Sequence, residues 1–274
     1  MKVVAIVQAR MGSSRLPNKV LLPVLGQPVL ALMLARVHAA RELDEVVVAT
    51  TSLAEDEPIR ELARQVGLRC VSGDPLDLLD RHLLAAQVTQ ADAIVKIPSD
   101  CPLIDPRVID EVVRCFRDHS DRYDFVGNLH PASWPDGNDV EVLSRGALEQ
   151  AGREATRPHE REHTTPFVWD RPERFRLGNV VWRAGLDLSR SHRLTLDYPD
   201  DFRVIAAVFE ALYRPGEPPF AVEEIVAHLE CHPELLALNA RFKGTGWVDR
   251  HRHELRTRQP RVPAVERGVG GGPS

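Results

Sequence analysis

The sequence predicts an α/β fold built on a mostly parallel, doubly wound sheet. Three short runs of apolar and β-branched residues have the length of buried strands, at 3–7, 45–50 and 93–97. Stretches with helical spacing of apolar residues separate these runs. Such an alternation of strands and helices favours parallel strands joined by crossover helices. The chain has 274 residues, enough for one domain with a large core.

The first hundred residues follow this alternation element by element. A turn at residues 26–28 leads into a predicted helix over 29–40, where apolar residues recur at helical spacing. Gly67 closes a later helix, because glycine readily adopts the left-handed conformation that ends helices. The predicted elements after the first helix are a strand over 45–50, a helix over 56–66, a strand over 69–72, a helix over 77–88 and a strand over 93–97.

The second half of the chain has a different character. Residues 128–140 are rich in turn formers, and Asp201 suits the positive end of a helix that we expect over 200–213. Residues 244–274 are polar and glycine-rich, so we expect a disordered tail after a single domain over 1–243. The other predicted elements are strands over 141–143, 175–182 and 193–196 and one or two amphipathic helices over 220–238.

Charge and hydropathy exclude two classes of partner. The formal net charge is −5 and 27% of the residues are charged, which gives no general basic surface for nucleic acid. The first apolar run is too short for a signal peptide, and no apolar segment of membrane-spanning length follows. We therefore expect a cytoplasmic protein that binds neither nucleic acid nor membrane.

The loop after the first strand carries the strongest functional signal. Glycine lets backbone N–H groups approach a ligand closely, and arginine and lysine neutralise an anion. Open α/β sheets bind phosphates at this position. We predict a polyanionic ligand here, although these charges would also suit a solvated surface loop. The loop combines one glycine, two serines and three cations: Arg10, Gly12, Ser13, Ser14, Arg15 and Lys19.

Asp100 follows the strand over 93–97 and should lie at the same sheet edge as this loop. A carboxylate that faces a polyphosphate is repelled unless a hard cation lies between them. Mg²⁺ commonly binds through one or two carboxylates together with phosphate oxygens. Asp100 is therefore a candidate Mg²⁺ ligand. The alternative is a helix-capping role, for which Asp105 before Pro106 is the better candidate.

Four motifs resemble those of one enzyme family. Q-A-R-M-G-S-S-R-L-P-N-K at 8–19 resembles the signature loop of cytidylyltransferases that activate acidic sugars, in particular a branch named after a spore-coat polysaccharide biosynthesis protein. D-C-P-L-I-D-P, E-R-E-H-T-T-P-F and L-D-Y-P-D-D-F resemble later motifs in the same order, with Ser99 where relatives have glycine. The resemblance implies a Rossmann-like, three-layer nucleotidyltransferase core, similar to glycosyltransferase-A, with a mostly parallel mixed sheet.

This resemblance also implies an activity and a set of site residues. The expected reaction transfers CMP from CTP to an acidic sugar or sugar phosphate, releases pyrophosphate and depends on Mg²⁺. The family resemblance further implies a homodimer, with residues 128–182 as a region for sugar binding and dimerisation. The implied catalytic residues are Arg15, Lys19 and Asp100, and the implied metal ligands are Asp100 and Asp197. The implied nucleotide contacts are Gln8, Ala9, Arg10, Gly12, Ser13, Ser14, Arg15, Lys19 and Arg81, and the implied sugar contacts are Asp136, Asp139, Glu141, Arg161 and His163.

Other interpretations remain open at this point. His159-Glu160-x-x-His163 satisfies the H-E-x-x-H pattern of zinc proteases. Prolines at 158 and 166 leave only a short helix for both histidines, which weakens that interpretation. A glycosyltransferase or a nucleotide-sugar-binding protein of the same fold is a further alternative, and Asp136, Asp139 and Glu141 would also suit a solvated turn. The acceptor itself is open among nonulosonic acids, shorter keto-deoxy acids and sugar phosphates.

Overall fold

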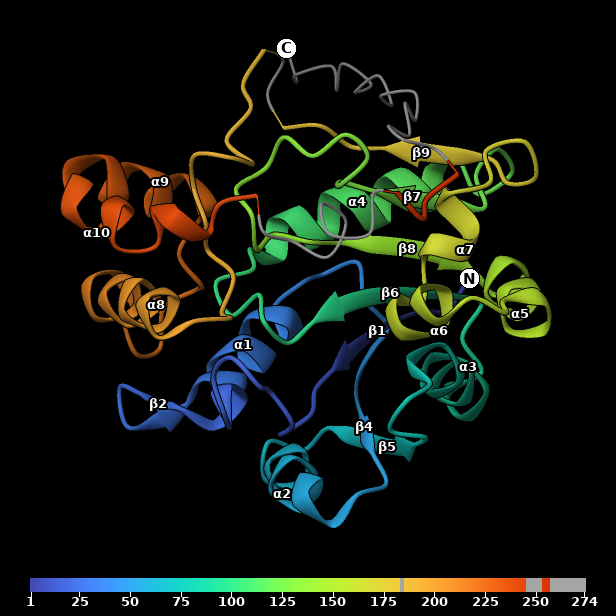
Figure 1. The fold of residues 1–274 in the computed structure, drawn as a ribbon, viewed down its shortest axis with the longest axis horizontal. Helices are drawn as coiled ribbons and strands as arrows, with labels where there is room; N and C mark the ends of the chain where they lie inside the picture. The colour runs from blue at the N-terminus through green and yellow to red at the C-terminus, as the bar shows by residue number, and fades with distance from the viewer. Residues whose placement is uncertain (183–184, 245–252, 257–274) are drawn as a thin grey trace.

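The computed structural model describes residues 1–182, 185–244 and 253–256. Its main sheet has seven strands in the order β5-β4-β1-β6-β8-β7-β9. All neighbouring strands are parallel except that β8 is antiparallel to both β6 and β7. The predicted α/β class with a mostly parallel mixed sheet is confirmed (Figure 1). The strands are β1 (Val3–Gln8), β4 (Glu45–Thr51), β5 (Arg69–Gly73), β6 (Ala93–Pro98), β7 (Phe125–Gly127), β8 (Glu141–Ser144) and β9 (Leu177–Asn179).

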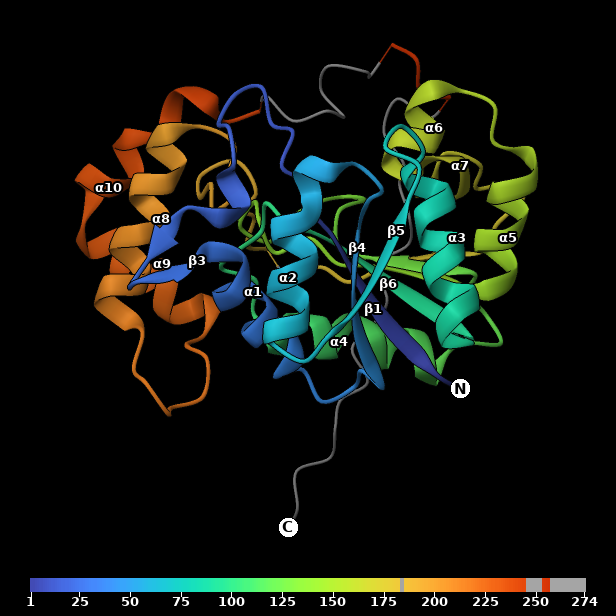
Figure 2. The same cartoon turned by 90° about the horizontal axis from the view of Figure 1, so that it is seen from below.

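Helices cover both faces of this sheet (Figure 2). One face packs against α1 (Val29–His38), α2 (Glu57–Gln65) and α4 (Pro106–Asp118). The opposite face packs against α3 (Leu78–Thr89), α5 (Arg145–Glu154) and α7 (Pro166–Trp169). The short α6 (Pro158–His163) contacts α3. The remaining elements are the hairpin β2 (Pro23–Val24) and β3 (Gln27–Pro28) and the 3₁₀ turns η1 (Lys19–Leu21), η2 (Ala54–Asp56) and η3 (Ala240–Phe242).

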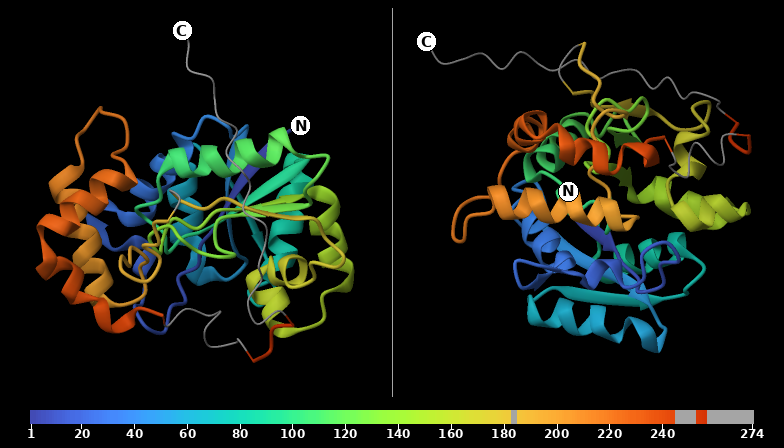
Figure 3. Two further views of the ribbon diagram at one scale, coloured as in Figure 1. Left: turned by 90° about the horizontal axis from the view of Figure 1, so that it is seen from above. Right: turned by 60° about the vertical axis from the view of Figure 1, so that its left-hand side comes forward.

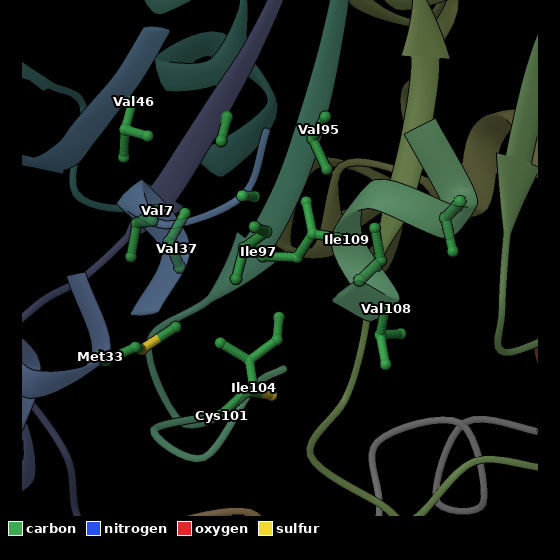
Figure 4. Close-up of a cluster of buried hydrophobic side chains, with 14 of the residues drawn as sticks. Val7, Met33, Val37, Val46, Val95, Ile97, Cys101, Ile104, Val108 and Ile109 are labelled. Atoms are coloured by element: carbon green, nitrogen blue, oxygen red, sulfur yellow. The ribbon is translucent and has the colours of Figure 1, made fainter. Parts of the chain in front are cut away.

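Burial on both faces explains why residues 3–7 of strand β1 are all apolar. Its odd-numbered residues, such as Val7, belong to the core cluster on the α1 and α4 face, which Figure 4 shows in part. Its even-numbered residues Val4 and Ile6 belong to the cluster on the α3 and α5 face. A strand that is buried on both faces needs apolar side chains at every position. The strand predicted over 3–7 is therefore confirmed.

A third helical group forms one end of the molecule (Figure 3). It consists of α8 (Pro199–Leu212), α9 (Val222–Cys231) and α10 (Pro233–Leu238), which pack on an apolar cluster that also includes Val29 and Leu32 of α1. The amphipathic stretch predicted over 220–238 is thus two helices, because Pro233 cannot continue the first one. Among the described residues, no helix is long and apolar enough to cross a membrane.

The structure corrects several predicted elements. Residues 193–196 form no strand, because their backbone bonds to loops instead: Leu194 N–H donates to Asp136 O at 2.6 Å. The strand predicted over 175–182 is shorter, at Leu177–Asn179. Helix α4 and strand β7 were not predicted from the sequence. The predicted capping role of Asp105 is confirmed, because Asp105 accepts a hydrogen bond from Arg107 N–H at 2.8 Å at the start of α4.

Part of the predicted tail contacts the domain. Leu255 is 8% exposed and belongs to the core cluster that contains Trp169. Arg256 N–H donates to Asp170 Oδ2 at 2.8 Å, and the Arg157 guanidinium donates to Glu254 O at 3.1 Å. The buried Leu255 side chain and these two hydrogen bonds hold residues 253–256 against the domain. The rest of the tail beyond Gly244 lies outside the described residues.

Candidate active site

The loop after β1 is held in place by a residue from a distant part of the chain. Met11 N–H donates to Asp56 Oδ1 at 2.6 Å, and the Thr51 hydroxyl donates to the other carboxylate oxygen. Asp56 is fully buried at the end of η2, which follows β4. A buried carboxylate that accepts hydrogen bonds from a backbone amide fixes that stretch of backbone. Asp56 was predicted only as the start of a helix, and this role was not predicted from the sequence.

The far end of the loop directs Lys19 inward. Asn18 adopts the left-handed conformation, with φ at 57°, which asparagine tolerates better than most residues. Lys19 then starts the 3₁₀ turn η1, and its side chain is 13% exposed. Leu16 N–H donates weakly to the Ser13 hydroxyl at 3.4 Å. Ser13 and Asn18 thus help to shape the backbone of this loop.

Lys19 joins the two candidate metal ligands. Its Nζ lies 3.0 Å from Asp197 Oδ1 and 3.5 Å from Asp100 Oδ2, and it donates to Leu196 O at 2.9 Å. Burial lowers the pKa of Lys19, but the carboxylates of Asp100 and Asp197 outweigh burial and hold that pKa above its usual value. These three residues, which we call the Lys19 cluster, come from three separate loops. The sequence predicted all three as site residues, and they meet here.

Arg15 adds a second cation to the Lys19 cluster. Its Nη2 lies 2.6 Å from Asp197 Oδ1, and its guanidinium lies 5.3 Å from the centre of the Tyr198 ring. Burial raises the pKa of Asp197, but Lys19 and Arg15 outweigh burial and hold it below its usual value. Asp197 is therefore ionised at neutral pH, which a metal ligand requires.

Backbone hydrogen bonds keep the two carboxylates adjacent. Leu196 N–H donates to Asp100 O at 2.7 Å, and the Thr195 hydroxyl donates to the same oxygen at 3.1 Å. Asp100 follows β6 and Asp197 precedes α8. These contacts explain why the segment over 193–196 is extended without being a strand of the sheet.

A second charged group, the Arg193 bracket, lies beside the Lys19 cluster and consists of Arg193, Asp201 and Asn239. The Arg193 guanidinium contacts both Asp201 oxygens, at 2.9 and 3.0 Å, and Asn239 Nδ2 donates to Asp201 Oδ1 at 3.0 Å. Asp201 also accepts the backbone N–H groups of Asp197 and Tyr198, at 3.0 and 2.9 Å. The predicted capping role of Asp201 is confirmed, and it fixes the backbone of a candidate metal ligand.

Asp136 and Asp139 extend the acidic surface toward the predicted acceptor side. Arg193 Nη1 lies 3.3 Å from Asp136 Oδ2. Burial raises the pKa of both carboxyls, and neighbouring carboxylates add to the effect, including Asp100 in both cases. Gly137 between them has φ at 109°, and a Cβ there would lie 2.7 Å from the backbone of Leu194. Only glycine lets this loop pack so closely on the segment that carries Asp197.

Arg81 lies on the other side of the loop, on α3. Its Nη1 donates to Asp74 O at 2.6 Å, while its Nε is buried without a hydrogen-bond partner. Burial, followed by repulsion from Arg10, lowers the pKa of Arg81. Two cations that repel each other beside an unpaired donor form a place for an anion. This geometry is compatible with the nucleotide contact predicted for Arg81 and Arg10.

Two predicted sugar contacts have partners outside the Lys19 cluster. Glu141 on β8 is 3% exposed, and its Oε2 lies 2.6 Å from Lys96 Nζ on β6. Arg161 on α6 lies 2.5 Å from Asp77 Oδ2 at the start of α3. His163 is the last residue of α6. The sequence analysis did not single out Lys96, although a lysine inside an apolar strand was a visible signal.

The H-E-x-x-H segment has structural partners instead of a zinc site. Arg171 Nη2 lies 2.5 Å from Glu160 Oε1, so this carboxylate is engaged in a buried ion pair. His159 Nδ1 lies 3.2 Å from Glu254 Oε2. Across the part of the chain that the structure describes, no group of three or more histidine, cysteine or acidic side chains has metal-binding geometry. The protease interpretation therefore receives no support.

Comparisons with known proteins bear on the same region. The family model described as "Cytidylyltransferase" matches residues 4–212. A solved cytidylyltransferase from Leptospira borgpetersenii serovar Hardjo-bovis is similar to this chain, with 31% identity and a TM-score of 0.80 over 86% of this chain and 97% of its own. The spore coat polysaccharide biosynthesis protein SpsF of Bacillus subtilis is 27% identical over 238 residues, or 85% of this chain and 95% of SpsF.

A third relative matches over a shorter span. The 8-amino-3,8-dideoxy-manno-octulosonate cytidylyltransferase of Shewanella frigidimarina is 30% identical over 131 residues, which are 46% of this chain and 52% of that protein. The match to this enzyme thus covers about half of its length. The family model, by contrast, spans the loop after β1, Asp100 and Asp197 together.

Proposed function

The chain belongs to the cytidylyltransferase family, and from this premise we propose that it transfers CMP from CTP to an acidic sugar or sugar phosphate. The reaction would release pyrophosphate and serve surface polysaccharide or glycoconjugate synthesis. One observation carries the proposal: Lys19 Nζ lies 3.0 Å from Asp197 and 3.5 Å from Asp100. A cation suited to binding phosphate and two candidate metal ligands thus lie together at one edge of the sheet, which supports a proposal of nucleotidyl transfer.

The triphosphate would bind to the loop between β1 and η1. Arg15 and Lys19 supply positive charge there, and the backbone around Gly12 and Ser13 supplies N–H groups. A sugar oxygen would attack the α-phosphorus in line while the bond to pyrophosphate breaks. Such a step depends on positioning and on charge stabilisation. Lys19 and Arg15 would stabilise the negative charge that develops on the pyrophosphate.

The residues present fit a hard divalent cation. Asp100 and Asp197 offer carboxylate oxygens, and the Asp100 side chain is 31% exposed. The Lys19 ammonium group contacts both carboxylates and carries positive charge, as a metal cation would. In our proposal Asp100 and Asp197 hold Mg²⁺, which favours two carboxylates with phosphate oxygens over a cage of protein ligands. When bound, Mg²⁺ would neutralise phosphate charge and lower the pKa of the attacking hydroxyl.

The acceptor would bind on the β8 side of the Lys19 cluster. Asp136 and Asp139 border this side, and the Arg193 bracket supports Asp136. The acidic nature of the sugar is inferred from relatives, one of which is named for an amino-dideoxy-octulosonate. A homodimer and a cytoplasmic location stay predictions, as do the substrate contacts of Arg161 and His163.

A pyrophosphate-release assay tests this function. Purified protein with Mg²⁺ would be given each of the four nucleoside triphosphates and a panel of acidic sugars and sugar phosphates. We expect release with CTP and one acceptor class, and loss of that release in Asp197→Asn. Asp200→Asn is the matched control, because Asp200 contacts only Arg203 and Arg241 among the described residues. Silence of the wild-type protein across the whole panel would overturn the proposal.

A further inference from the structure

The loop after β1 contacts the helical end of the molecule through two adjacent residues. Leu16 packs against the apolar cluster that α8 and α9 share with α1. The Arg15 guanidinium lies 5.3 Å from the centre of the Tyr198 ring. Tyr198 stands between Asp197, a candidate metal ligand, and the start of α8. Arg15 thus has neighbours that come from far along the chain.

A second aromatic residue holds the Tyr198 ring. Phe242 in η3 stacks on it, with 3.8 Å between the ring centres and 5° between the ring planes. A ring stacked at this distance occupies one face of its neighbour and restricts the rotation of that neighbour. Tyr198 and Phe242, which we call the aromatic pair, are both partly buried.

The segment that carries Phe242 is fixed at its start. Asn239 is 1% exposed, and its Nδ2 donates to Arg193 O and to Asp201 Oδ1, each at 3.0 Å. Phe242 N–H in turn donates to Asn239 O at 3.0 Å, which closes η3. The Arg193 bracket therefore anchors Phe242, although the family model ends at residue 212.

An aromatic ring is a suitable partner for a cation that must bind phosphate. A ring attracts a guanidinium group through its π face when the group lies within about 6 Å of the ring centre. The N–H donors of arginine lie in the plane of the guanidinium group, so contact with a ring face leaves them available to an anion. Asp197, by contrast, occupies a donor of Arg15 at 2.6 Å. Tyr198 is therefore the neighbour that can hold Arg15 while its donors bind phosphate.

We propose that the aromatic pair positions Arg15 for phosphate binding, with Phe242 acting through Tyr198. This inference rests on the proposed function. Tyr198 and Phe242 are positioning residues, because they act on Arg15 and need not touch the substrate. The turn η3 then contributes to the active site from outside the residues that the family model matches.

A comparison of ring loss with ring retention tests this inference. Tyr198→Leu and Phe242→Leu each remove one ring, whereas Tyr198→Phe and Phe242→Tyr keep the stack. We expect kcat/KM for CTP to fall by about 3- to 30-fold in Tyr198→Leu, the range of a cation–π contact, and less in Phe242→Leu. Both ring-retaining variants should keep the wild-type value. Phe202→Leu is the matched control, because it removes a ring that packs on the same helical cluster.

A double-mutant cycle distinguishes positioning of Arg15 from a general structural role. In an Arg15→Met background, Phe242→Leu should cause no further loss of kcat/KM, because the side chain that the ring positions is absent. A general structural role would instead give losses that multiply, together with a lower unfolding free energy in urea. Losses that multiply, or equal losses in Tyr198→Phe and Tyr198→Leu, would overturn the inference and leave the proposed function standing.

Binding of inorganic tripolyphosphate in the presence of Mg²⁺ gives the same cycle without turnover. Tyr198→Leu should weaken this binding in calorimetry, and it should have no effect in the Arg15→Met background. If Tyr198→Leu does not fold, Phe242→Leu takes its place in both cycles. Unchanged tripolyphosphate affinity in the folded ring-loss variant would overturn the inference. A wild-type protein that releases no pyrophosphate with any acceptor would overturn the proposed function, and this inference with it.

Discussion

The Lys19 cluster and the Arg193 bracket lie side by side and both pair a cation with aspartate, but they differ in how far the carboxylates are buried. Arg193 is 4% exposed and Asp201 is fully buried, and their contact is bidentate, at 2.9 and 3.0 Å. In the Lys19 cluster, Asp100 is 31% exposed, and its contact with the Lys19 ammonium group is longer, at 3.5 Å. Protein groups therefore satisfy both oxygens of the Asp201 carboxylate, whereas the Asp100 carboxylate is accessible to a ligand.

The Arg193 bracket positions Asp197, whereas the Lys19 cluster contains the groups proposed for the chemistry. Asp201 fixes the backbone N–H groups of Asp197 and Tyr198 and thereby aims the Asp197 carboxylate. Asp197 itself is shared by Lys19 and Arg15, whose charges a nucleotide would need. We therefore expect substitutions in the bracket to change stability first, and substitutions in the Lys19 cluster to change turnover first.

The largest expected effect is on the bracket. Arg193→Leu leaves the Asp201 carboxylate buried without its guanidinium, and breaking such a pair costs about 3–5 kcal/mol in the free energy of unfolding. Urea denaturation followed by circular dichroism measures this loss. Arg203→Leu is the control, because its pair with Asp200 is exposed and surface pairs contribute about 0–1 kcal/mol. Equal losses in both variants would show that the bracket is not a closed structural unit.

Lys19→Met should lower turnover more than stability, which is the opposite of the effect expected for Arg193→Leu. The substitution removes a preorganised cation from the phosphate site, which lowers turnover by about 10²–10³-fold. Arg15 still faces Asp197, and Asp100 still reaches solvent, so the unfolding free energy should change much less than in Arg193→Leu. Single-turnover pyrophosphate release and urea denaturation on one preparation give both quantities. Normal turnover in Lys19→Met would refute its role at the phosphate.

The smallest effect concerns pH and the buried His130, whose Nε2 lies 3.9 Å from Glu141 Oε1. Burial lowers the pKa of His130 to about 4, below its usual value of 6.5. As pH falls through this window, the unfolded chain takes up a proton that the folded protein does not, so the unfolding free energy decreases from about pH 6.5 to about pH 4. His130→Gln should flatten that slope in urea titrations at several pH values. An unchanged slope would contradict a neutral, buried His130.

Local composition was enough to predict some features and not others. The strands 3–7, 45–50 and 93–97 could be predicted because a strand that is buried on both faces has a nearly continuous run of apolar residues. Arg193 looked like the start of a strand, because its real partners, Asp201 and Asp136, belong to tertiary structure that no short window contains. The predicted phosphate loop and both candidate metal ligands meet in space, whereas their substrate roles stay predictions.

The Asp56 contact has a consequence for how related sequences are classified. A motif search over residues 8–19 inspects the loop but never the carboxylate that holds Met11 N–H at 2.6 Å. A homologue that keeps the loop motif but has no acidic residue at position 56 would lack the hydrogen bond that holds Met11 N–H in this chain. Genome annotation of this branch should therefore score position 56 jointly with the loop, as a single discontinuous signature.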